Sequence, residues 1–366
     1  MRIVFAGGGT GGHLYPAIAM ARELMRRHKA SEVLFVGTSE GLEARILPEE
    51  GFHLETIRMM GIKGKKPMEQ LRALFRFPVA LVQSLRILRS FRPDAVVGVG
   101  GYASGPVVLG AWLLRMHTML QEQNSVPGVT NRVLARFAKR IYIAYGAAEA
   151  FFPGRKVLLT GNPLRVDMLS GERKKGMEVF ALEEGRKTVL ILGGSRGAHA
   201  INELVSAMVT EDWLGRTPVQ FLHQTGADDI DSVRAAYKSA GFQGEVRPYF
   251  HEMGLAYSVA DLVISRAGAV ALSELQAAGL PAILIPFPFA ADDHQMKNAR
   301  SLEATGAAVV FEQNDLTPTR LAAAVGELLG DEARLAAMAA AARREARPDA
   351  AARIVDDVER IVKRAA

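Results

Sequence analysis

The chain has 366 residues, of which 49% are hydrophobic, so it is too long for one ordinary domain and suits two. It contains no cysteine, which excludes disulfides and thiolate metal sites and fits a cytosolic protein. The net charge of +6 is concentrated in one segment, Arg58–Arg92, which holds nine lysines or arginines and a single glutamate.

This basic segment predicts an anionic partner, either a membrane surface or a nucleic acid, and a plain solvated face is the simpler alternative. Met1 and Arg2 lead directly into an apolar strand, so we expect no signal peptide. The uncharged stretch 95–114 is about as long as a membrane span. It contains clustered glycines and Pro106, so a buried strand, a glycine loop and a buried helix explain it better.

Short apolar runs alternate with helical segments along the whole chain. Such alternation predicts the α/β class, with parallel sheets covered by helices on both faces. The pattern begins again at Thr188, and the turn-forming sequences 152–154 and 161–163 indicate a boundary near residue 160. The predicted strands are 2–6, 33–37, 53–57, 95–99, 117–120, 140–143, 157–159, 188–192, 219–223, 245–248, 262–264, 282–285 and 308–310.

The last segment of the chain is an alanine-rich helical region. Five apolar residues recur there at helical spacing on one face, so we expect this helix to pack against a core. They are Ile354, Val355, Val358, Ile361 and Val362.

The most informative stretch is Gly7–His13, a glycine-rich loop between the strand 2–6 and a helix that follows. Glycines let a ligand approach backbone N–H groups closely, and a helix start favours an anion such as a diphosphate. The loop also matches the spacing of dinucleotide-binding loops, but those need an acid at the end of the second strand. That strand, 33–37, is followed by Thr38, so a nicotinamide cofactor is disfavoured.

Four loops are expected at the carboxyl ends of strands, where open parallel sheets bind ligands. They are Gly7–His13, Gly100–Ser104, Gly193–Ala198 and Ser265–Ala269. The last of them starts a helix and therefore offers a second anion site. Glu274, on this helix, is either a solvent-facing residue or an acceptor for ligand hydroxyls such as a ribose diol.

Two polar clusters also follow predicted strands. Asp292–Gln295 suggests a metal site, but adjacent residues rarely converge on one ion, so hydrogen bonding to a polyhydroxyl ligand fits better. Gln121–Asn124 is either a solvated loop or part of a ligand site.

Together these motifs resemble the MurG family of bacterial glycosyltransferases, which is part of glycosyltransferase family 28. They are spread in order over nearly the whole chain, as Gly8–His13, Gly100–Tyr102, Gln121–Asn124, Gly161–Arg165, Gly193–Ser195 and Ser265–Glu274. The resemblance implies a GT-B fold, with two Rossmann-like, doubly wound parallel-sheet domains that face a cleft. It implies an N-terminal domain of residues 1–162 plus 345–366, because the last helix crosses back, and a C-terminal domain of residues 163–344.

The resemblance also implies an activity. The family transfers N-acetylglucosamine from UDP-N-acetylglucosamine to the muramyl 4-hydroxyl of lipid I, giving lipid II for peptidoglycan synthesis. The transfer is inverting and uses no metal or other cofactor. It takes place at the cytoplasmic face of the bacterial inner membrane. The implied partners are therefore the two substrates and an anionic membrane surface, with no nucleic acid.

By motif, the donor is implied to lie mainly on the second domain. The backbone of Phe250 is implied to read uracil, and Glu274 to bind the ribose hydroxyls. His294 departs from the family, where a second glutamine or another polar residue often stands, so sugar identity is expected to depend more on Gln295. The implied donor-binding residues are Thr10, Gly11, Gly12, Asn124, Arg165, Ser195, Phe250, Gly268, Ala269, Val270, Ala271, Leu272, Ser273, Glu274, His294 and Gln295.

The acceptor is implied to lie on the first domain. His13 is the predicted catalytic group, accepting or orienting the proton of the acceptor hydroxyl, because imidazole titrates near neutral pH. A structural role at the helix start is the simpler alternative for His13, and Glu122 is the rival base. The implied acceptor-binding residues are Gly9, His13, Gly100, Gly101, Tyr102 and Ser104.

The basic segment is predicted to dock on an anionic membrane. Apolar residues there are interleaved with cations, so the former would enter the interface while the latter meet lipid headgroups. The later part, which includes Val79, Val82, Leu85 and Leu88, is expected to face the core. The predicted membrane residues are Lys63, Lys65, Lys66, Arg72, Leu74, Phe75, Arg76 and Phe77.

Two other functions remain open at this stage. A UDP-N-acetylglucosamine 2-epimerase would use the same donor without a lipid acceptor. A protein that binds nucleotide sugars or membranes without catalysis would bind the donor and release no UDP.

Overall fold

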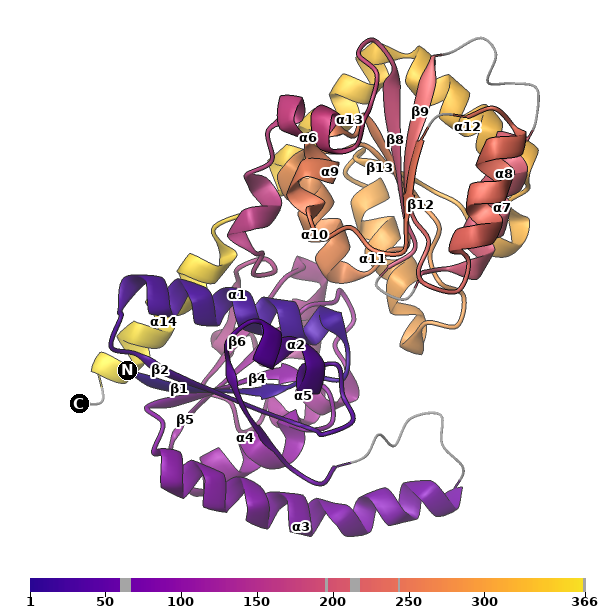
Figure 1. Cartoon of the computed structure of the whole chain (residues 1–366). Coiled ribbons are helices and arrows are strands. Elements are labelled where there is room, and N and C mark those ends of the chain that lie inside the picture. The colour runs from indigo at the N-terminus through magenta and orange to yellow at the C-terminus, as the bar shows by residue number, and fades with distance from the viewer. Residues whose placement is uncertain (60–66, 195–196, 211–217, 243, 365–366) are drawn as a thin grey trace. The chain divides into compact units, whose positions relative to one another are not determined.

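The structure is a computed structural model that describes residues 1–59, 67–194, 197–210, 218–242 and 244–364. In the helix that begins at Pro67, the side chains are described from residue 76 onward. The chain forms two compact units (Figure 1). The first comprises Met1–Arg165 and Arg347–Ala366, and the second comprises Val166–Ala346.

The first unit is built on a seven-stranded parallel sheet with the order β3-β2-β1-β4-β5-β6-β7. Helices α1, α2 and α14 cover one face, and α3, α4 and α5 cover the other. The strands are β1 (Arg2–Gly7), β2 (Glu32–Gly37), β3 (His53–Thr56), β4 (Ala95–Gly100), β5 (His117–Glu122), β6 (Arg140–Ile143) and β7 (Val157–Leu159). The helices are α1 (Gly11–Arg27), α2 (Glu43–Glu49), α3 (Pro67–Phe91), α4 (Ser104–Leu113), α5 (Val129–Leu134) and α14 (Ala350–Lys363).

The second unit has a six-stranded parallel sheet with the order β10-β9-β8-β11-β12-β13. Helices α9, α10 and α11 pack on one face, and α7, α8 and α12 on the other. The strands are β8 (Lys187–Leu192), β9 (Val219–Gln224), β10 (Gly244–Arg247), β11 (Leu262–Ser265), β12 (Ala282–Leu284) and β13 (Ala308–Val310). The helices are α6 (Arg173–Val179), α7 (His199–Val209), α8 (Ile230–Ser239), α9 (Met253–Val259), α10 (Ala269–Ala278), α11 (His294–Glu303), α12 (Pro318–Gly330) and α13 (Glu332–Glu345).

The predicted α/β class is confirmed, and every predicted strand is present to within two residues at each end. The uncharged stretch 95–114 forms strand β4 and helix α4, as expected. Strand β4 is buried throughout and α4 is mostly buried as far as Ala111, which explains why these residues carry no charge. Across the part of the chain that the structure describes, no helix has the length and apolarity needed to cross a bilayer.

The predicted core face of helix α3 is confirmed at Leu88, which is fully buried, and is wrong at Val79 and Val82. Val79 and Val82 were expected to face the core, yet they are 50% and 49% exposed. The buried side of α3 is formed by residues spaced four apart, Ala80, Ser84 and Leu88, each of which is fully buried. Because Val79 and Val82 are i, i+3 neighbours on the opposite side, they lie on the solvent face.

Helix α14 returns to the first unit and completes its core. Its apolar residues Ile354, Val355, Val358 and Ile361 are buried in the cluster that includes helix α1 and strands β1 and β4. The predicted packing face of this helix is therefore confirmed.

A buried carboxylate fixes helix α14 to the sheet. Asp357 is 1% exposed and accepts hydrogen bonds from Nε of Arg140 at 2.8 Å and from the hydroxyl of Tyr142 at 3.1 Å, both on β6. Arg360, one turn along the helix, pairs with the second oxygen at 3.0 Å. Burial, together with the neighbouring charge of Asp357, raises the pKa of Tyr142 well above its ordinary value, so its hydroxyl remains a donor.

We predict that Asp357→Ala destabilises the protein by about 3 kcal/mol, because it leaves buried donors of Arg140 and Tyr142 without their acceptor. The measurement is the free energy of unfolding in urea. Asp356→Ala is the matched control, because Asp356 is its sequence neighbour, is exposed and pairs with Arg27 at the surface. The control should cost less than about 1 kcal/mol. Equal losses in the two variants would contradict a special role for the buried carboxylate.

Candidate active site

Each sheet has one place where the strand order reverses direction. It lies between β1 and β4 in the first unit and between β8 and β11 in the second. In open parallel sheets, ligands bind at this point, outside the carboxyl ends of the strands. The four predicted loops follow these four strands, so the expectation that they lie at the carboxyl ends is confirmed.

The two loops of the first unit cross with almost no space between their backbones. A Cβ on Gly7 would lie 2.2 Å from the carbonyl oxygen of Gly100, and a Cβ on Gly101 would lie 2.6 Å from that of Gly8. Gly101 also has φ +79°, a region that side chains disfavour. Glycine is therefore required at Gly7 and Gly101 by space, and the two loops hold each other in place.

A carboxylate that the sequence did not point to supports the first loop from inside the unit. Glu43, at the start of α2, is 1% exposed. Its Oε2 accepts from the N–H of Gly9 at 2.7 Å, and its Oε1 accepts from both the N–H and the hydroxyl of Thr38 at 2.9 Å. The sequence signal for this role was weak: Glu43 is an acid in the first turn of a helix, two residues after Gly41.

His13 lies in the first turn of α1 with one ring nitrogen directed to the loop. Its Nδ1 is 3.1 Å from the carbonyl oxygen of Gly8 and 3.2 Å from the hydroxyl oxygen of Thr10. The ring passes over Gly100, where a Cβ would lie 2.9 Å from Cδ2 of the imidazole. The imidazole is thus held by the crossing loops at the carboxyl end of the sheet.

Glu122, the rival base, is surrounded by donors of its own loop. Its Oε1 accepts from the backbone and side-chain N–H groups of Asn124 at 3.0 and 3.2 Å. Its Oε2 accepts from Nδ2 of Asn131 at 2.8 Å and from the N–H of Gly128 at 3.3 Å. The carboxylate is 2% exposed. This geometry favours a structural role in shaping the loop after β5, with Asn124 and Asn131 as its partners.

The rest of the polar cluster after β5 is a buried network. Gln121 donates to Oδ1 of Asn162 at 3.1 Å, and Nδ2 of Asn162 in turn donates to the carbonyl oxygen of Gln123 at 3.2 Å. All three side chains are at most 2% exposed. The solvated-loop alternative is therefore wrong for Gln121 and Gln123.

Two predicted acceptor residues of the loop after β4 differ in exposure. Tyr102 is 39% exposed. Ser104 is fully buried, and its Oγ is directed at Gly98 of β4, where a Cβ would lie 2.6 Å away. Because Ser104 is the first residue of α4 and faces the sheet, it cannot contact a ligand, and we remove it from the candidate site.

In the second unit, Glu274 lies on α10 and is partly exposed. Its Oε2 accepts a hydrogen bond of 2.8 Å from the hydroxyl of Tyr257, on α9. The sequence did not single out Tyr257, because the two residues are brought together only by the packing of two helices. The tyrosine fixes the direction of the carboxylate. Within the run 268–274, Leu272 is fully buried and Ala269 is 6% exposed, so their side chains face the core.

Arg266 joins the loops that follow β11 and β12. Its guanidinium donates to the carbonyl oxygens of Ile285 and Pro286 at 3.0 and 3.2 Å, and to Oε1 of Gln313 at 2.7 Å. Burial lowers the pKa of Arg266 to about 10, so it is charged at neutral pH. This partly buried positive charge therefore joins the loop before α10 to the loop after β12.

Gln295 and Phe250 use part of their hydrogen-bonding capacity inside the unit. Oε1 of Gln295 accepts from the N–H groups of Phe287 at 2.9 Å and Ala267 at 3.3 Å. The N–H of Phe250 donates to Gln224 at 3.0 Å. The amide nitrogen of Gln295 and the carbonyl oxygen of Phe250 are therefore the groups to consider for ligand binding.

His294 begins α11, and its Nδ1 lies 2.6 Å from the carbonyl oxygen of Ala291. Asp292 and Asp293 beside it both have φ +55°. Within the described residues, no group of three histidine, aspartate or glutamate side chains gathers where a metal could bind.

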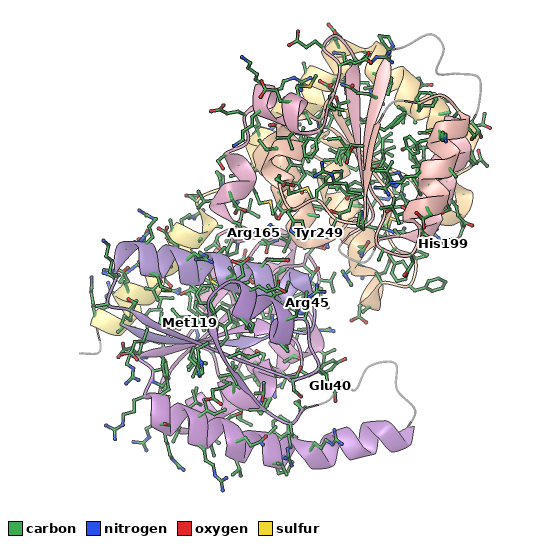
Figure 2. The ribbon with its side chains drawn as sticks, in the orientation of Figure 1. Glu40, Arg45, Met119, Arg165, His199 and Tyr249 are labelled. Carbon is green, nitrogen blue, oxygen red and sulfur yellow. The ribbon has the colours of Figure 1, made fainter. Side chains whose placement is uncertain are left out.

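Ser195 and Arg165 are two of the predicted donor-binding residues. Ser195 lies outside the described residues. Arg165 is the last residue of the first part of the first unit, and its guanidinium lies 4.7 Å from the ring centroid of Tyr15 on α1 (Figure 2). This cation–π contact orients the arginine.

Comparison with protein families gives two matches that together cover most of the chain. Residues 3–143 match the glycosyltransferase family 28 N-terminal domain, and residues 188–354 match the glycosyltransferase family 28 C-terminal domain. The two matched ranges contain the four loops, Glu43, Glu122 and Glu274.

Curated relatives are similar over nearly their full length. A protein of Anaeromyxobacter sp. (strain Fw109-5) is 48% identical over all of this chain and 94% of its own length. One of Myxococcus xanthus is 46% identical over 97% of this chain and 92% of its own. Both are named UDP-N-acetylglucosamine–N-acetylmuramyl-(pentapeptide) pyrophosphoryl-undecaprenol N-acetylglucosamine transferase.

Among solved structures, Acinetobacter baumannii MurG has a TM-score of 0.79 and 32% identity, covering 98% of this chain and 99% of its own. A UDP-GlcNAc 2-epimerase from Neisseria meningitidis has a TM-score of 0.70 over 98% of this chain and all of its own, with 13% identity. At that identity the second likeness concerns the fold alone.

Proposed function

The chain belongs to glycosyltransferase family 28, and from this membership we infer that it is a hexosyltransferase of the GT-B fold. It transfers N-acetylglucosamine from UDP-N-acetylglucosamine to an N-acetylmuramyl-(pentapeptide) pyrophosphoryl-undecaprenol acceptor, the substrate that the names of its relatives specify. The product is lipid II, a precursor of peptidoglycan. The observation that carries this inference is identity of 46 to 48% along whole chains that share one activity.

We propose that the second unit binds the donor. The start of α10, at Gly268–Val270, would hold the diphosphate with its N–H groups. Glu274, already oriented by Tyr257, would accept the ribose hydroxyls. The carbonyl oxygen of Phe250 would accept from the uracil N–H, and the amide nitrogen of Gln295 would donate to a sugar hydroxyl.

We propose that the first unit binds the acceptor, with His13 as the base. The acceptor hydroxyl would lose its proton to the imidazole as its oxygen attacks the anomeric carbon from the side opposite to the leaving UDP. Attack from that side inverts the configuration. Negative charge would develop on the departing diphosphate, where preorganised N–H groups and a cation stabilise it most effectively. The loops after β1 and β4, with Tyr102, would surround the acceptor sugar.

We propose further that the solvent face of α3 docks on an anionic membrane, as a peripheral contact on the cytoplasmic side. Arg76, Val79, Val82, Arg86 and Arg89 share this face by helical spacing, and all five side chains are exposed. This arrangement interleaves cations with apolar groups, as interfacial helices do. Trp112 and Leu113, at the end of the neighbouring α4, are also exposed. Figure 1 shows α3 and α4 on the same side of the first sheet.

Of the sequence-predicted membrane residues, Lys63, Lys65 and Lys66 lie outside the described residues, and the side chains of Arg72, Leu74 and Phe75 are not described.

The proposed activity is tested by measuring UDP release from radiolabelled UDP-N-acetylglucosamine with and without a lipid I analogue. A transferase releases UDP only with the acceptor, and the label moves into lipid. Label in free sugar but not in lipid would indicate an epimerase. Donor binding without UDP release in the presence of the acceptor would indicate a binding protein.

We predict that Glu274→Ala weakens donor binding by about 1–3 kcal/mol, the cost of losing hydrogen bonds to a charged acceptor. Calorimetric titration with UDP-N-acetylglucosamine measures this loss. With a donor analogue that lacks both ribose hydroxyls, the variant and the original chain should bind equally. An unchanged dissociation constant for the normal donor would remove Glu274 from the site.

We predict that His13→Ala lowers kcat by about 10²-fold or more, because general bases contribute roughly 10²–10⁴ in rate. The donor dissociation constant and the thermal midpoint should stay the same. His28→Ala is the matched control, since His28 lies at the other end of α1 and pairs with Glu359. Near-normal kcat in His13→Ala, or joint loss of donor affinity and stability, would assign His13 a structural role and return attention to Glu122.

We predict that Arg86→Ala with Arg89→Ala reduces partitioning onto anionic vesicles by about 1 kcal/mol for each cation. Vesicle flotation measures the partition coefficient. Removing two exposed lysines of the second unit, Lys174 and Lys175, is the matched control and should change little. Equal binding of the original chain to neutral and anionic vesicles, or binding to neither, would refute membrane docking by this face.

A further inference from the structure

One peptide unit of the first glycine loop is hydrogen-bonded on both sides. The N–H of Gly9 donates to Oε2 of Glu43 at 2.7 Å, and the carbonyl oxygen of Gly8 lies 3.1 Å from Nδ1 of His13. These two groups belong to the same peptide bond, and in a trans peptide they point in opposite directions. The carboxylate and the imidazole therefore contact opposite edges of one amide plane.

We propose that Glu43 is a positioning residue for His13, acting through the peptide bond between Gly8 and Gly9. The proposal rests on the role of His13 proposed above. A carbonyl oxygen only accepts hydrogen bonds, so the contact with Gly8 requires the proton to be on Nδ1. The neutral ring then has its lone pair on Nε2, and this atom would receive the proton of the acceptor hydroxyl.

The hydroxyl of Thr10 is compatible with this tautomer but does not determine it. It lies 3.2 Å from the same Nδ1 and can either accept from a protonated nitrogen or donate to an unprotonated one. The carbonyl of Gly8 has no such choice. The direction of the Gly8–Gly9 peptide, which Glu43 fixes, therefore selects the tautomer.

The charge of Glu43 also reaches the imidazole through the amide. A carboxylate on the N–H side polarises the peptide and makes its carbonyl oxygen a stronger acceptor, because hydrogen bonds in a chain reinforce one another. A stronger acceptor stabilises the positive ring that forms when Nε2 takes a proton. The carboxylate of a Ser-His-Asp triad does the same by direct contact. Here one peptide group is inserted between the acid and the histidine.

The segments that follow β1 and β2 together leave room for this carboxylate. A Cβ on Gly8, Gly37 or Gly41 would lie 2.5, 2.6 or 2.2 Å from atoms of the Glu43 side chain. Three glycines therefore leave room for one buried acid, whose remaining hydrogen bonds come from Thr38. The competing explanation is that Glu43 only maintains the shape of the loop, and the experiment must separate the two.

The kinetic test is a double-mutant cycle with Glu43→Gln and His13→Ala. Glu43→Gln keeps the size of the side chain but removes the charge and replaces one acceptor by a donor. We expect kcat to fall by about 10- to 100-fold, the range that loss of such outer partners costs at metal-bound histidines. The KM for the donor should not change. In the His13→Ala background, Glu43→Gln should cause no further loss of kcat, because its effect passes through His13.

The outcomes separate the two proposals. If the losses of kcat multiply in the double variant, Glu43 acts independently of His13 and the positioning proposal is overturned. If His13→Ala alone retains kcat, the proposed role of His13 fails instead. Glu49→Gln, an exposed acid on the same helix, is the matched control and should leave kcat unchanged.

A second measurement does not depend on whether Glu43→Gln folds. The ring nitrogens of the unaltered chain are observed by ¹⁵N NMR after labelling its eight histidines, and His13 is identified by comparison with His13→Gln. We expect the neutral ring of His13 to carry its proton on Nδ1. A neutral ring protonated on Nε2 would overturn the proposal.

Discussion

The close crossing of two backbones at the switch point of the first sheet determines the geometry around it. The loops after β1 and β4 approach so closely that Gly7 and Gly101 have no room for a side chain. This contact fixes where α1 begins relative to the sheet and places the ring of His13 over Gly100. A larger residue at any of these positions would separate the loops and turn the imidazole. The same constraint explains why a glycine-rich sequence, which is flexible in an unfolded chain, forms a rigid platform here.

The two units use the same topology with opposite local charge. In the first unit a buried carboxylate, Glu43, occupies the N–H of Gly9, so this N–H is not available to an anionic ligand. In the second unit the partly buried group beside the corresponding loop is the guanidinium of Arg266, which joins the loops after β11 and β12. Strand, glycine loop and helix therefore do not by themselves define a phosphate site.

The sequence predicted the fold well because its signals are local. Apolar β-branched runs and glycine-rich turns located every strand, and strand ends located the loops. The roles of individual side chains depended on contacts between distant segments. Glu43 reaches Gly9 from another helix, and Tyr257 reaches Glu274 across a helix pair, so neither pattern is visible along the chain. Ser104 was predicted to bind the acceptor because it follows a glycine loop, as site residues often do. The first turn of α4 instead directs its side chain into the sheet.

Helix α14 belongs to the first unit although it is synthesised after the whole of the second. During translation, the β6 residues Arg140 and Tyr142 leave the ribosome long before Asp357 can reach them. The apolar face of α1 that α14 later covers stays open for the same interval. The second unit, which is continuous in sequence, has all its strands available earlier. Synthesis therefore delivers a complete second unit before the first can close, and the nascent first unit is the part of this chain that needs protection from aggregation.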